Sequence, residues 1–311
     1  MERKILVALN GSTLDQWSCD YLLSGLFADQ PQVVFHLLTL IPFHRATTAL
    51  NLFGDLETVA HNDAAAVAKM RKAKRHLEVL ARRFQEAGFA PEQLTCECRF
   101  CFGSTANTLM LMGQKGLYDA MLLSKREIPA LFKYVSGSIS ADIMEKNHSL
   151  PIWIVNGAPA GENFLVPVDC STPSLAAVDH LGFMLQGNST AQVTLFHSGA
   201  MLAQEKPVPP AEFHERWGKQ WCDEHLRPDG TFCFHASEQV LMEAGISSER
   251  VHLLTNKKGV EPARTIARLA REKAFATIVM GRQADRNKGI FKGVSDRVLG
   301  HVKDVAVWLV G

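Results

Sequence analysis

Short apolar runs alternate with longer segments of helical spacing along the whole chain. The apolar runs at residues 5–9 and 33–41 are rich in β-branched and aromatic side chains, which is typical of buried strands. The segments at residues 14–26 and 64–87 have instead the composition and spacing of helices. Strands that alternate with helices predict βαβ units and a parallel sheet, and right-handed crossovers place helices on both faces of that sheet.

The same order of segments occurs twice. ILVALNGS at residues 5–12 matches FLVPVDCS at residues 164–171, so that Asn10 corresponds to Asp169 and Ser12 to Ser171. A Ser at this turn can cap the helix that follows, because its oxygen accepts a hydrogen bond from a backbone N–H that has no partner within the helix. Further strands are expected at 33–41, 94–100 and 119–124 in the first half, and at 192–198, 251–255 and 276–281 in the second. Helices are expected at 14–26, 64–87 and 105–115, and at 173–185, 209–245 and 262–273.

A linker separates the two copies. NGAPAGEN at residues 156–163 is small, polar and contains Pro and Gly, as inter-domain segments often do. The sequence therefore predicts an α/β protein of two tandem doubly wound parallel-sheet domains, residues 1–158 and 159–311.

Composition narrows the class of protein. The 311 residues are 47% hydrophobic and 21% charged, which is ordinary for a globular protein, and a net charge of +1 gives no global attraction to nucleic acid or an anionic membrane. No apolar run approaches the ~20 residues that span a bilayer. Seven scattered cysteines do not resemble a disulfide framework, so we expect a reduced, cytoplasmic protein. The basic stretch at 69–84 is interpreted as an amphipathic helix, with nucleic-acid binding as the alternative.

Motifs for catalysis and metal binding are absent from the printed sequence. It contains no G-x-S-x-G, G-x-x-x-x-G-K-[ST] or G-x-G-x-x-G pattern, so an enzyme is not expected. Cys96, Cys98 and Cys101 form C-x-C-x-x-C, but no second pair follows at ligand spacing. His36 and His197 fall in the second strand of each half and are interpreted as core residues. No metal site is predicted.

The loop after each fourth strand carries a family resemblance. It reads SKREIPALFKYVSGSIS at residues 124–140 and GRQADRNKGIFKGVS at residues 281–295. A fourth strand that leads through such a loop into a helix opened by Gly-Ser resembles the universal stress protein family, here in its tandem form and over essentially the whole chain. The resemblance implies an adenine nucleotide alpha hydrolase-like fold. In ATP-binding members it also implies a phosphate loop of Gly, two residues, Gly, nine residues and Gly-Ser, with an Asp after the first strand at the adenosine.

The first half departs from this pattern. Ser124 and Glu127 stand at the two Gly positions, and Asn10 stands at the Asp position. A Glu127 carboxylate beside a triphosphate would repel it, which disfavours ATP. The nucleotide-contacting residues that the resemblance implies in this half are Asn10, Leu40, Gly137 and Ser138.

The second half keeps more of the pattern. Asp169 and Gly281 are retained, whereas Ala284 replaces the second Gly, and the loop is about two residues shorter, so that Lys292-Gly293 stands where Gly-Ser is expected. The loop cations Arg282, Arg286, Lys288 and Lys292 could hold phosphates by charge, or could form an ordinary solvated surface. The implied nucleotide-contacting residues in this half are Asp169, Ser198, Gly281, Arg282, Ala284, Lys292, Gly293 and Ser295.

The resemblance also implies how the halves associate. In family dimers the final strand pairs with its copy in the partner, and here one chain supplies both copies, at residues 150–155 and 305–310. Both runs are apolar on both faces, which suits covered strands. We therefore expect these two strands to pair and to bury Trp153 and Trp308. The chain would then be an internal pseudo-dimer, either as a monomer or within a homodimer.

Two functions remain open at this point. In the first, the protein is a cytoplasmic stress-response protein that binds ATP or a related adenine nucleotide in its second half. In the second, both pockets have decayed and the protein is an interaction scaffold that binds no nucleotide. Asp169, Gly281 and the loop cations favour the first, whereas Glu127, Asn10 and the missing Gly-Ser of the second half favour the second. No nucleic acid or membrane partner is expected in either case.

Overall fold

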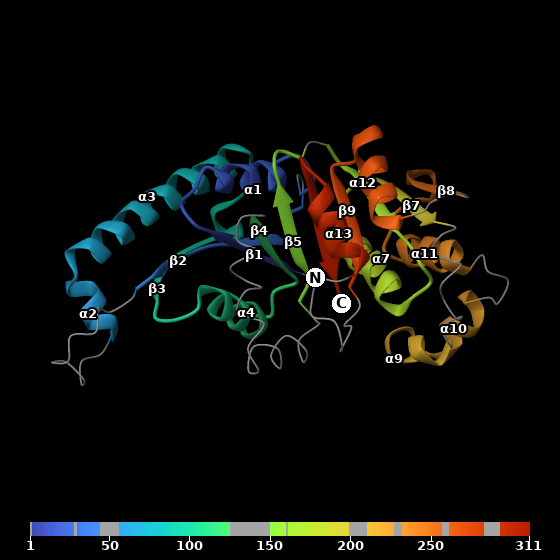
Figure 1. Ribbon diagram of the computed structural model, residues 1–311, viewed down its shortest axis with the longest axis horizontal. Helices are drawn as coiled ribbons and strands as arrows, with labels where there is room; N and C mark the ends of the chain where they lie inside the picture. The colour runs from blue at the N-terminus through green and yellow to red at the C-terminus, as the bar shows by residue number, and fades with distance from the viewer. Residues whose placement is uncertain are drawn as a thin grey trace. The chain divides into compact units, whose positions relative to one another are not determined.

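The computed structural model describes residues 2–27, 30–43, 56–124, 150–159, 161–198, 210–226, 232–256, 261–282 and 293–311. The chain divides into two compact units (Figure 1). Unit 1 consists of Met1–Leu23 and Pro31–Leu150, and unit 2 of Ser24–Gln30 and Pro151–Gly311.

Unit 1 is built on four parallel strands in the order β3-β2-β1-β4. Its strands are β1 (Arg3–Leu9), β2 (Val33–Pro42), β3 (Leu94–Cys101) and β4 (Ala120–Ser124). Its helices are α1 (Leu14–Leu22), α2 (Leu56–Asn62), α3 (Ala64–Glu86) and α4 (Thr105–Lys115). The helices α1 and α3 lie on one face of the sheet and α4 on the other (Figure 1).

Helix α3 shows how the sequence determines this arrangement. Asp63 caps its first turn by accepting a 2.9 Å hydrogen bond from the Ala66 N–H. Its basic face is in water, and the apolar stripe of Leu77, Leu80 and Phe84 is buried, with Phe84 against Phe35 of β2. The predicted amphipathic helix is confirmed.

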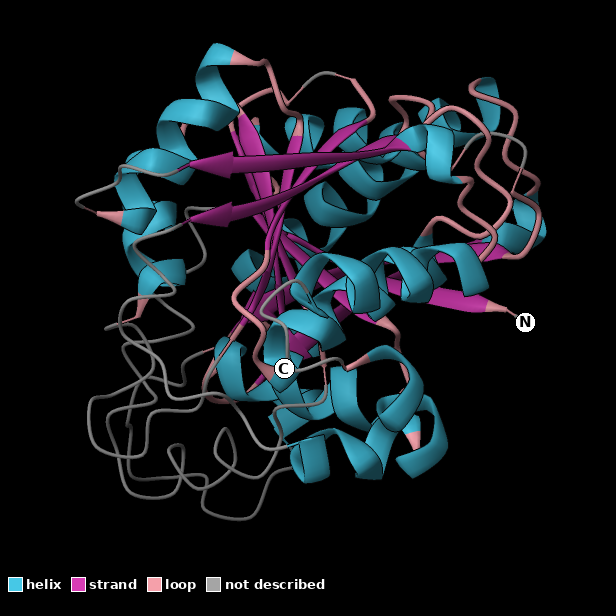
Figure 2. Cartoon of the chain, turned by 90° about the vertical axis from the view of Figure 1, so that its right-hand side faces the viewer, coloured by secondary structure: helices cyan, strands magenta, loops and turns pink. Residues whose placement is uncertain are grey.

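Unit 2 has five parallel strands and one antiparallel strand, in the order β5-β10-β9-β6-β7-β8. The strands are β5 (Ile152–Asn156), β6 (Asn163–Pro167), β7 (Gln192–Ser198), β8 (Val251–Asn256), β9 (Thr277–Gly281) and β10 (Val305–Val310). The helices are α7 (Thr172–Met184), α9 (His214–Trp217), α10 (Lys219–His225), α11 (Phe232–Glu243), α12 (Pro262–Glu272) and α13 (Val294–His301). Helix α7 packs on α11 and helix α12 on α13, so that helices cover both sides of the twisted sheet (Figure 2).

The two Trp-bearing runs pair as predicted. Strands β5 and β10 are antiparallel neighbours, with Trp153 directly opposite Trp308, and both indoles are fully buried. That the two halves of the chain form an internal pseudo-dimer stays a prediction.

Two predicted helices differ from the structure. The helix expected at residues 14–26 ends at Leu22, and the following segment belongs to unit 2, where Phe27 packs on Trp153. The helical stretch expected at 209–245 is broken, and one break falls at Gly218, whose φ of 77° is incompatible with a continuing helix. No helix in the described ranges has the length and apolar character that a membrane span requires. The expected cytoplasmic location stays a prediction.

Candidate functional site

In unit 2 the carboxyl ends of β6, β7 and β9 meet at one edge of the sheet, where ligands of doubly wound folds bind. Asp169 follows β6 and is half-buried. Its Oδ1 accepts hydrogen bonds from the N–H and Oγ of Ser171, at 3.1 and 2.6 Å. Within the described part of the chain Oδ2 accepts none, so it is available to a ligand.

Ser171 links this carboxylate to helix α7. Its Oγ accepts a 3.3 Å hydrogen bond from the Ser174 N–H, which confirms the predicted N-cap. The Ser174 Oγ in turn accepts from the Asp169 N–H at 3.3 Å. Cys170 between them has a left-handed φ of 64°. The first turn of α7 therefore fixes the direction of the Asp169 carboxylate.

Ser198 ends β7 at the same edge. Its side chain is fully buried, and its Oγ has no hydrogen-bond partner among the described residues. A buried hydroxyl is normally hydrogen-bonded. Ser198 thus offers an unsatisfied polar group to a ligand at this edge.

Gly281 ends β9, and packing alone explains the glycine. A Cβ at this position would lie 2.6 Å from the Ser174 backbone nitrogen and closer still to the Pro173 carbonyl. The side chain of Arg282 is buried and donates from Nε and Nη2 to the carbonyl of Gly311, at 3.2 and 3.0 Å. This guanidinium is therefore hydrogen-bonded to the residue that follows β10, and it is not directed outward as a phosphate ligand.

The remaining predicted residues of the second half are described only in part. Gly293 precedes α13, and among the described residues an added Cβ there would meet the Ser295 Oγ, at 3.9 Å. Ala284 and Lys292 lie outside the described residues, as do Arg286 and Lys288.

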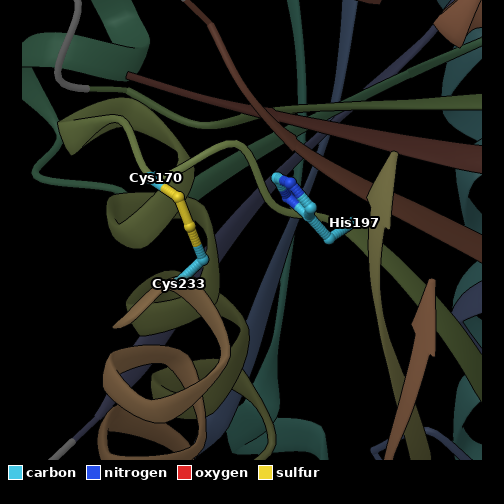
Figure 3. A group of neighbouring side chains, drawn as sticks. All are labelled: Cys170, His197 and Cys233. Atoms are coloured by element: carbon cyan, nitrogen blue, oxygen red, sulfur yellow. A yellow bond between two sulfur atoms is a disulfide. The ribbon is translucent and has the colours of Figure 1, made fainter. Parts of the chain in front are cut away.

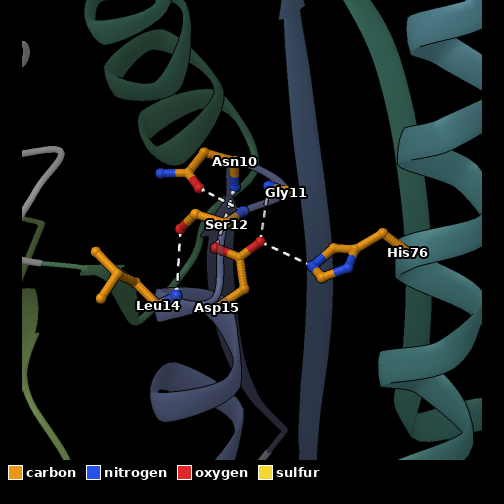
Figure 4. A network of polar contacts seen from close by, with 6 residues as sticks. All are labelled: Asn10, Gly11, Ser12, Leu14, Asp15 and His76. Carbon is orange, nitrogen blue, oxygen red and sulfur yellow. Dashed lines mark hydrogen bonds and ion pairs between the residues drawn. The ribbon is translucent and has the colours of Figure 1, made fainter.

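The corresponding loop of unit 1 is closed by its own side chains (Figure 4). Asp15 is 1% exposed and accepts hydrogen bonds from the N–H groups of Asn10 and Gly11, at 3.2 and 2.8 Å. It also faces the Nε2 of His76, on α3, at 3.0 Å. The Asn10 Oδ1 accepts from the Ser12 N–H at 2.9 Å, so this amide serves the turn.

Burial governs the charge of Asp15. It raises the pKa of this carboxyl above its usual range, against the hydrogen bonds of Asn10, Gly11 and His76, which lower it. Asp15 was not predicted from the sequence. In the match of the two halves it corresponds to Ser174, so its carboxylate lies five residues after Asn10, the residue that corresponds to Asp169. Leu40 is buried in β2. Gly137 and Ser138 lie outside the described residues, together with Glu127.

A group of sulfur and imidazole side chains lies at the same edge of unit 2 (Figure 3). Cys170 and Cys233 form a disulfide, and His197 of β7 points toward them. The expectation of a reduced chain without disulfides is wrong here. The fold brings the end of β6 to the first turn of α11, across a sequence separation of 63 residues that no local pattern reveals.

Comparison with known proteins identifies the second half. The model of the Universal stress protein family matches residues 162–310, so this part of the chain carries one domain of that family. A search of curated proteins finds no match. The second family domain, expected over residues 1–158, stays a prediction.

Solved structures confirm the fold. A universal stress protein from Archaeoglobus fulgidus DSM 4304 is 16% identical, with a TM-score of 0.56, and the likeness covers 99% of this chain and 95% of that chain. A universal stress protein in complex with cAMP is 15% identical, with a TM-score of 0.32, over 49% of this chain and 96% of that one. A family protein from Burkholderia pseudomallei is 16% identical, with a TM-score of 0.31, over 49% and 94%. The predicted α/β class with its mostly parallel sheet is correct.

Proposed function

We propose that the protein is a stress-response protein that acts by binding an adenine nucleotide at the carboxyl edge of the unit 2 sheet, rather than by catalysis. The observation that carries the proposal is the Asp169 carboxylate, which Ser171 holds by one oxygen while the other accepts no hydrogen bond from a described residue. An acceptor in this position suits the hydroxyls of a ribose or the amino group of an adenine. The family domain over residues 162–310 supports this choice of ligand.

The phosphate end is assigned to the start of α13. Backbone N–H groups at a helix N-terminus favour an anion, and Gly293 stands directly before this helix. Ser295 lies in the first turn of this helix and offers a hydroxyl. Arg282 takes no part in the proposal, because its guanidinium binds Gly311.

Unit 1 is proposed not to bind the nucleotide. Asp15 already accepts from the loop N–H groups of Asn10 and Gly11, and the Asn10 amide oxygen is used within the turn. These groups would have to exchange existing hydrogen bonds for those of a ligand. The competing function, an interaction scaffold without nucleotide, predicts that neither half responds to ATP.

The test is the melting temperature of the full chain with and without Mg-ATP. A ligand at one hundred times its Kd adds ~2.7 kcal/mol to the free energy of unfolding when it binds only the folded state. Asp169→Asn keeps an oxygen for Ser171 but presents an N–H₂ donor to the ligand, and should abolish the shift. Asn10→Ala is the matched control and should keep it. A shift that survives Asp169→Asn would exclude this site, and no shift in the unmodified protein would favour the scaffold.

A further inference from the structure

Three side chains from separate elements converge at the carboxyl edge of unit 2. Cys170 follows β6, His197 lies near the end of β7, and Cys233 is in the first turn of α11. Their two sulfurs and one imidazole nitrogen all lie within 4.8 Å of one another. Figure 3 shows the imidazole extending from its strand toward the two sulfurs. Thiolate and imidazole are the preferred ligands of zinc in proteins.

The imidazole is oriented as in a metal ligand. The Nδ1 of His197 lies 2.6 Å from the carbonyl oxygen of Val168, so Nδ1 carries the proton and donates it to that oxygen. The lone pair is therefore on Nε2. His197 is only 8% exposed, and its Nε2 has no hydrogen-bond partner among the described residues. A backbone carbonyl that fixes the tautomer while the other nitrogen remains unsatisfied is the usual support of a zinc-bound histidine.

The cavity beside the sulfurs is small. It has a volume of about 10 Å³ and is lined by Cys170 and Cys233, by apolar residues and by three serines, but not by His197. A volume of roughly 10–15 Å³ is the least that holds one water molecule, so the cavity has no room for an organic ligand. Three protein ligands with one position left to water is an established zinc arrangement.

We infer that Cys170, Cys233 and His197 form a zinc site when the two cysteines are reduced. An external dithiol first exchanges with the bridge, so that the S–S bond is broken, two protein thiols form and the dithiol becomes the disulfide. Zn²⁺ then binds both sulfurs and the Nε2, and displaces one proton from each thiol. The disulfide and the zinc site are thus two states of one cluster.

Sequence reasoning predicted no metal site, because these ligands share no local spacing. The cysteines that are close in sequence, Cys96, Cys98 and Cys101, form the motif C-x-C-x-x-C. Within the described residues that motif does not gather three ligand atoms, whereas the fold gathers the other three. None of its three ligands is assigned to the nucleotide, but Cys170 and His197 directly adjoin Asp169 and Ser198 in the sequence.

The test uses the full chain, reduced with a dithiol that is then removed under anaerobic, metal-free conditions. Co²⁺ is added as a spectroscopic probe, followed by Zn²⁺ in competition. We expect thiolate-to-cobalt charge-transfer absorption, its loss on addition of Zn²⁺, and one zinc per chain after dialysis. Cys170→Ser, Cys233→Ser and His197→Gln should each weaken zinc binding by about tenfold or more.

Matched controls separate this site from the remaining thiols and imidazoles. Cys96→Ser removes an exposed cysteine and His252→Gln an exposed histidine, so both variants should bind zinc as the unmodified chain does. Circular dichroism of the metal-free form shows whether each variant is folded. If a single variant is unfolded, the double variant Cys170→Ala/Cys233→Ala takes its place. Zinc binding that persists in that double variant would overturn the inference. A bridge that resists reduction until the protein unfolds would also overturn it, since the pair would then be a structural disulfide only.

Discussion

The indole rings of Trp153 and Trp308 stack in parallel, with centroids 3.8 Å apart and planes 3° apart. They come from antiparallel strands of unit 2 and occupy directly opposed positions. Phe27 stacks on Trp153 at 6.0 Å, and the Trp153 Nε1 donates to the Nε2 of His180 at 3.1 Å. This aromatic cluster joins β5 to β10 within the core of unit 2.

Removal of one indole should therefore be costly. Trp153→Ala is expected to lower the free energy of unfolding by about 3–5 kcal/mol, because it leaves a cavity beside Trp308 and removes the donor to His180. Urea denaturation measures the change. Trp17→Ala is the control: Trp17 is 39% exposed, and its loss should cost about 0.5 kcal/mol or less. Equal effects of the two substitutions would show that the stack contributes nothing beyond ordinary surface burial.

His180 should make stability depend on pH. Burial, with a smaller contribution from the Arg216 charge, lowers its pKa to about 3, whereas in the unfolded chain it stays near 6.5. Between these values the unfolded state binds a proton that the folded state does not. Stability is therefore complete above about pH 6.5, and falls by roughly 1.4 kcal/mol per unit as the pH drops toward 3.

The variant His180→Gln isolates this contribution, because Gln keeps an acceptor for the Trp153 N–H but does not titrate. The difference in unfolding free energy between the unmodified protein and this variant should shrink as the pH is lowered from 6.5 to 4. Urea titrations at several pH values measure it. A difference that stays constant over this range would mean that His180 titrates alike in both states.

Gly281 should be needed for packing, whether or not a nucleotide binds. Gly281→Ala places a methyl group on the backbone of Pro173 and Ser174 and should destabilise the protein by about 1–3 kcal/mol. Gly300→Ala is the control, because a Cβ there meets nothing within 4 Å, and the helical position should gain about 0.5–1 kcal/mol. Thermal melts without ligand measure both. An unchanged melting temperature for Gly281→Ala would indicate that helix α7 can shift to admit the methyl group.

Much of the fold could be predicted because its signals are local. Runs such as residues 33–41 and 192–198 are apolar enough to be strands in any context, and β2 and β7 lie where they were expected. The pairing of β5 with β10 required a family resemblance, since two apolar runs do not by themselves specify a partner. The end of α1 at Leu22 was missed because residues 23–26 are still helix-compatible, whereas in the structure the chain passes into unit 2 at Ser24.

The site was less predictable, because its determinants are contacts between distant residues. Asp169 could be found from its place after a strand. The direction of Arg282 could not, because it depends on where β10 ends in space. The approach of Cys170 to Cys233 likewise depends on how α11 packs on α7. The spacing of residues in the sequence reveals a set of ligands only when all of them lie on one helix, one strand or one turn.

Asp15 should stabilise the loop that closes the unit 1 edge. Asp15→Ala removes the buried acceptor of the Asn10 and Gly11 N–H groups and the partner of His76, and the loss of hydrogen bonds to a charged group should cost about 1.5–3 kcal/mol. Asp20→Ala is the matched control, since Asp20 is exposed and pairs with Arg83 at the surface, where an ion pair contributes about 0–1 kcal/mol. Urea denaturation distinguishes the two. If Asp15→Ala costs no more than Asp20→Ala, the carboxylate does not hold the loop closed. Unit 1 would then not be closed by its own side chains, and the strand end at Asn10 would be as open to a ligand as the one at Asp169.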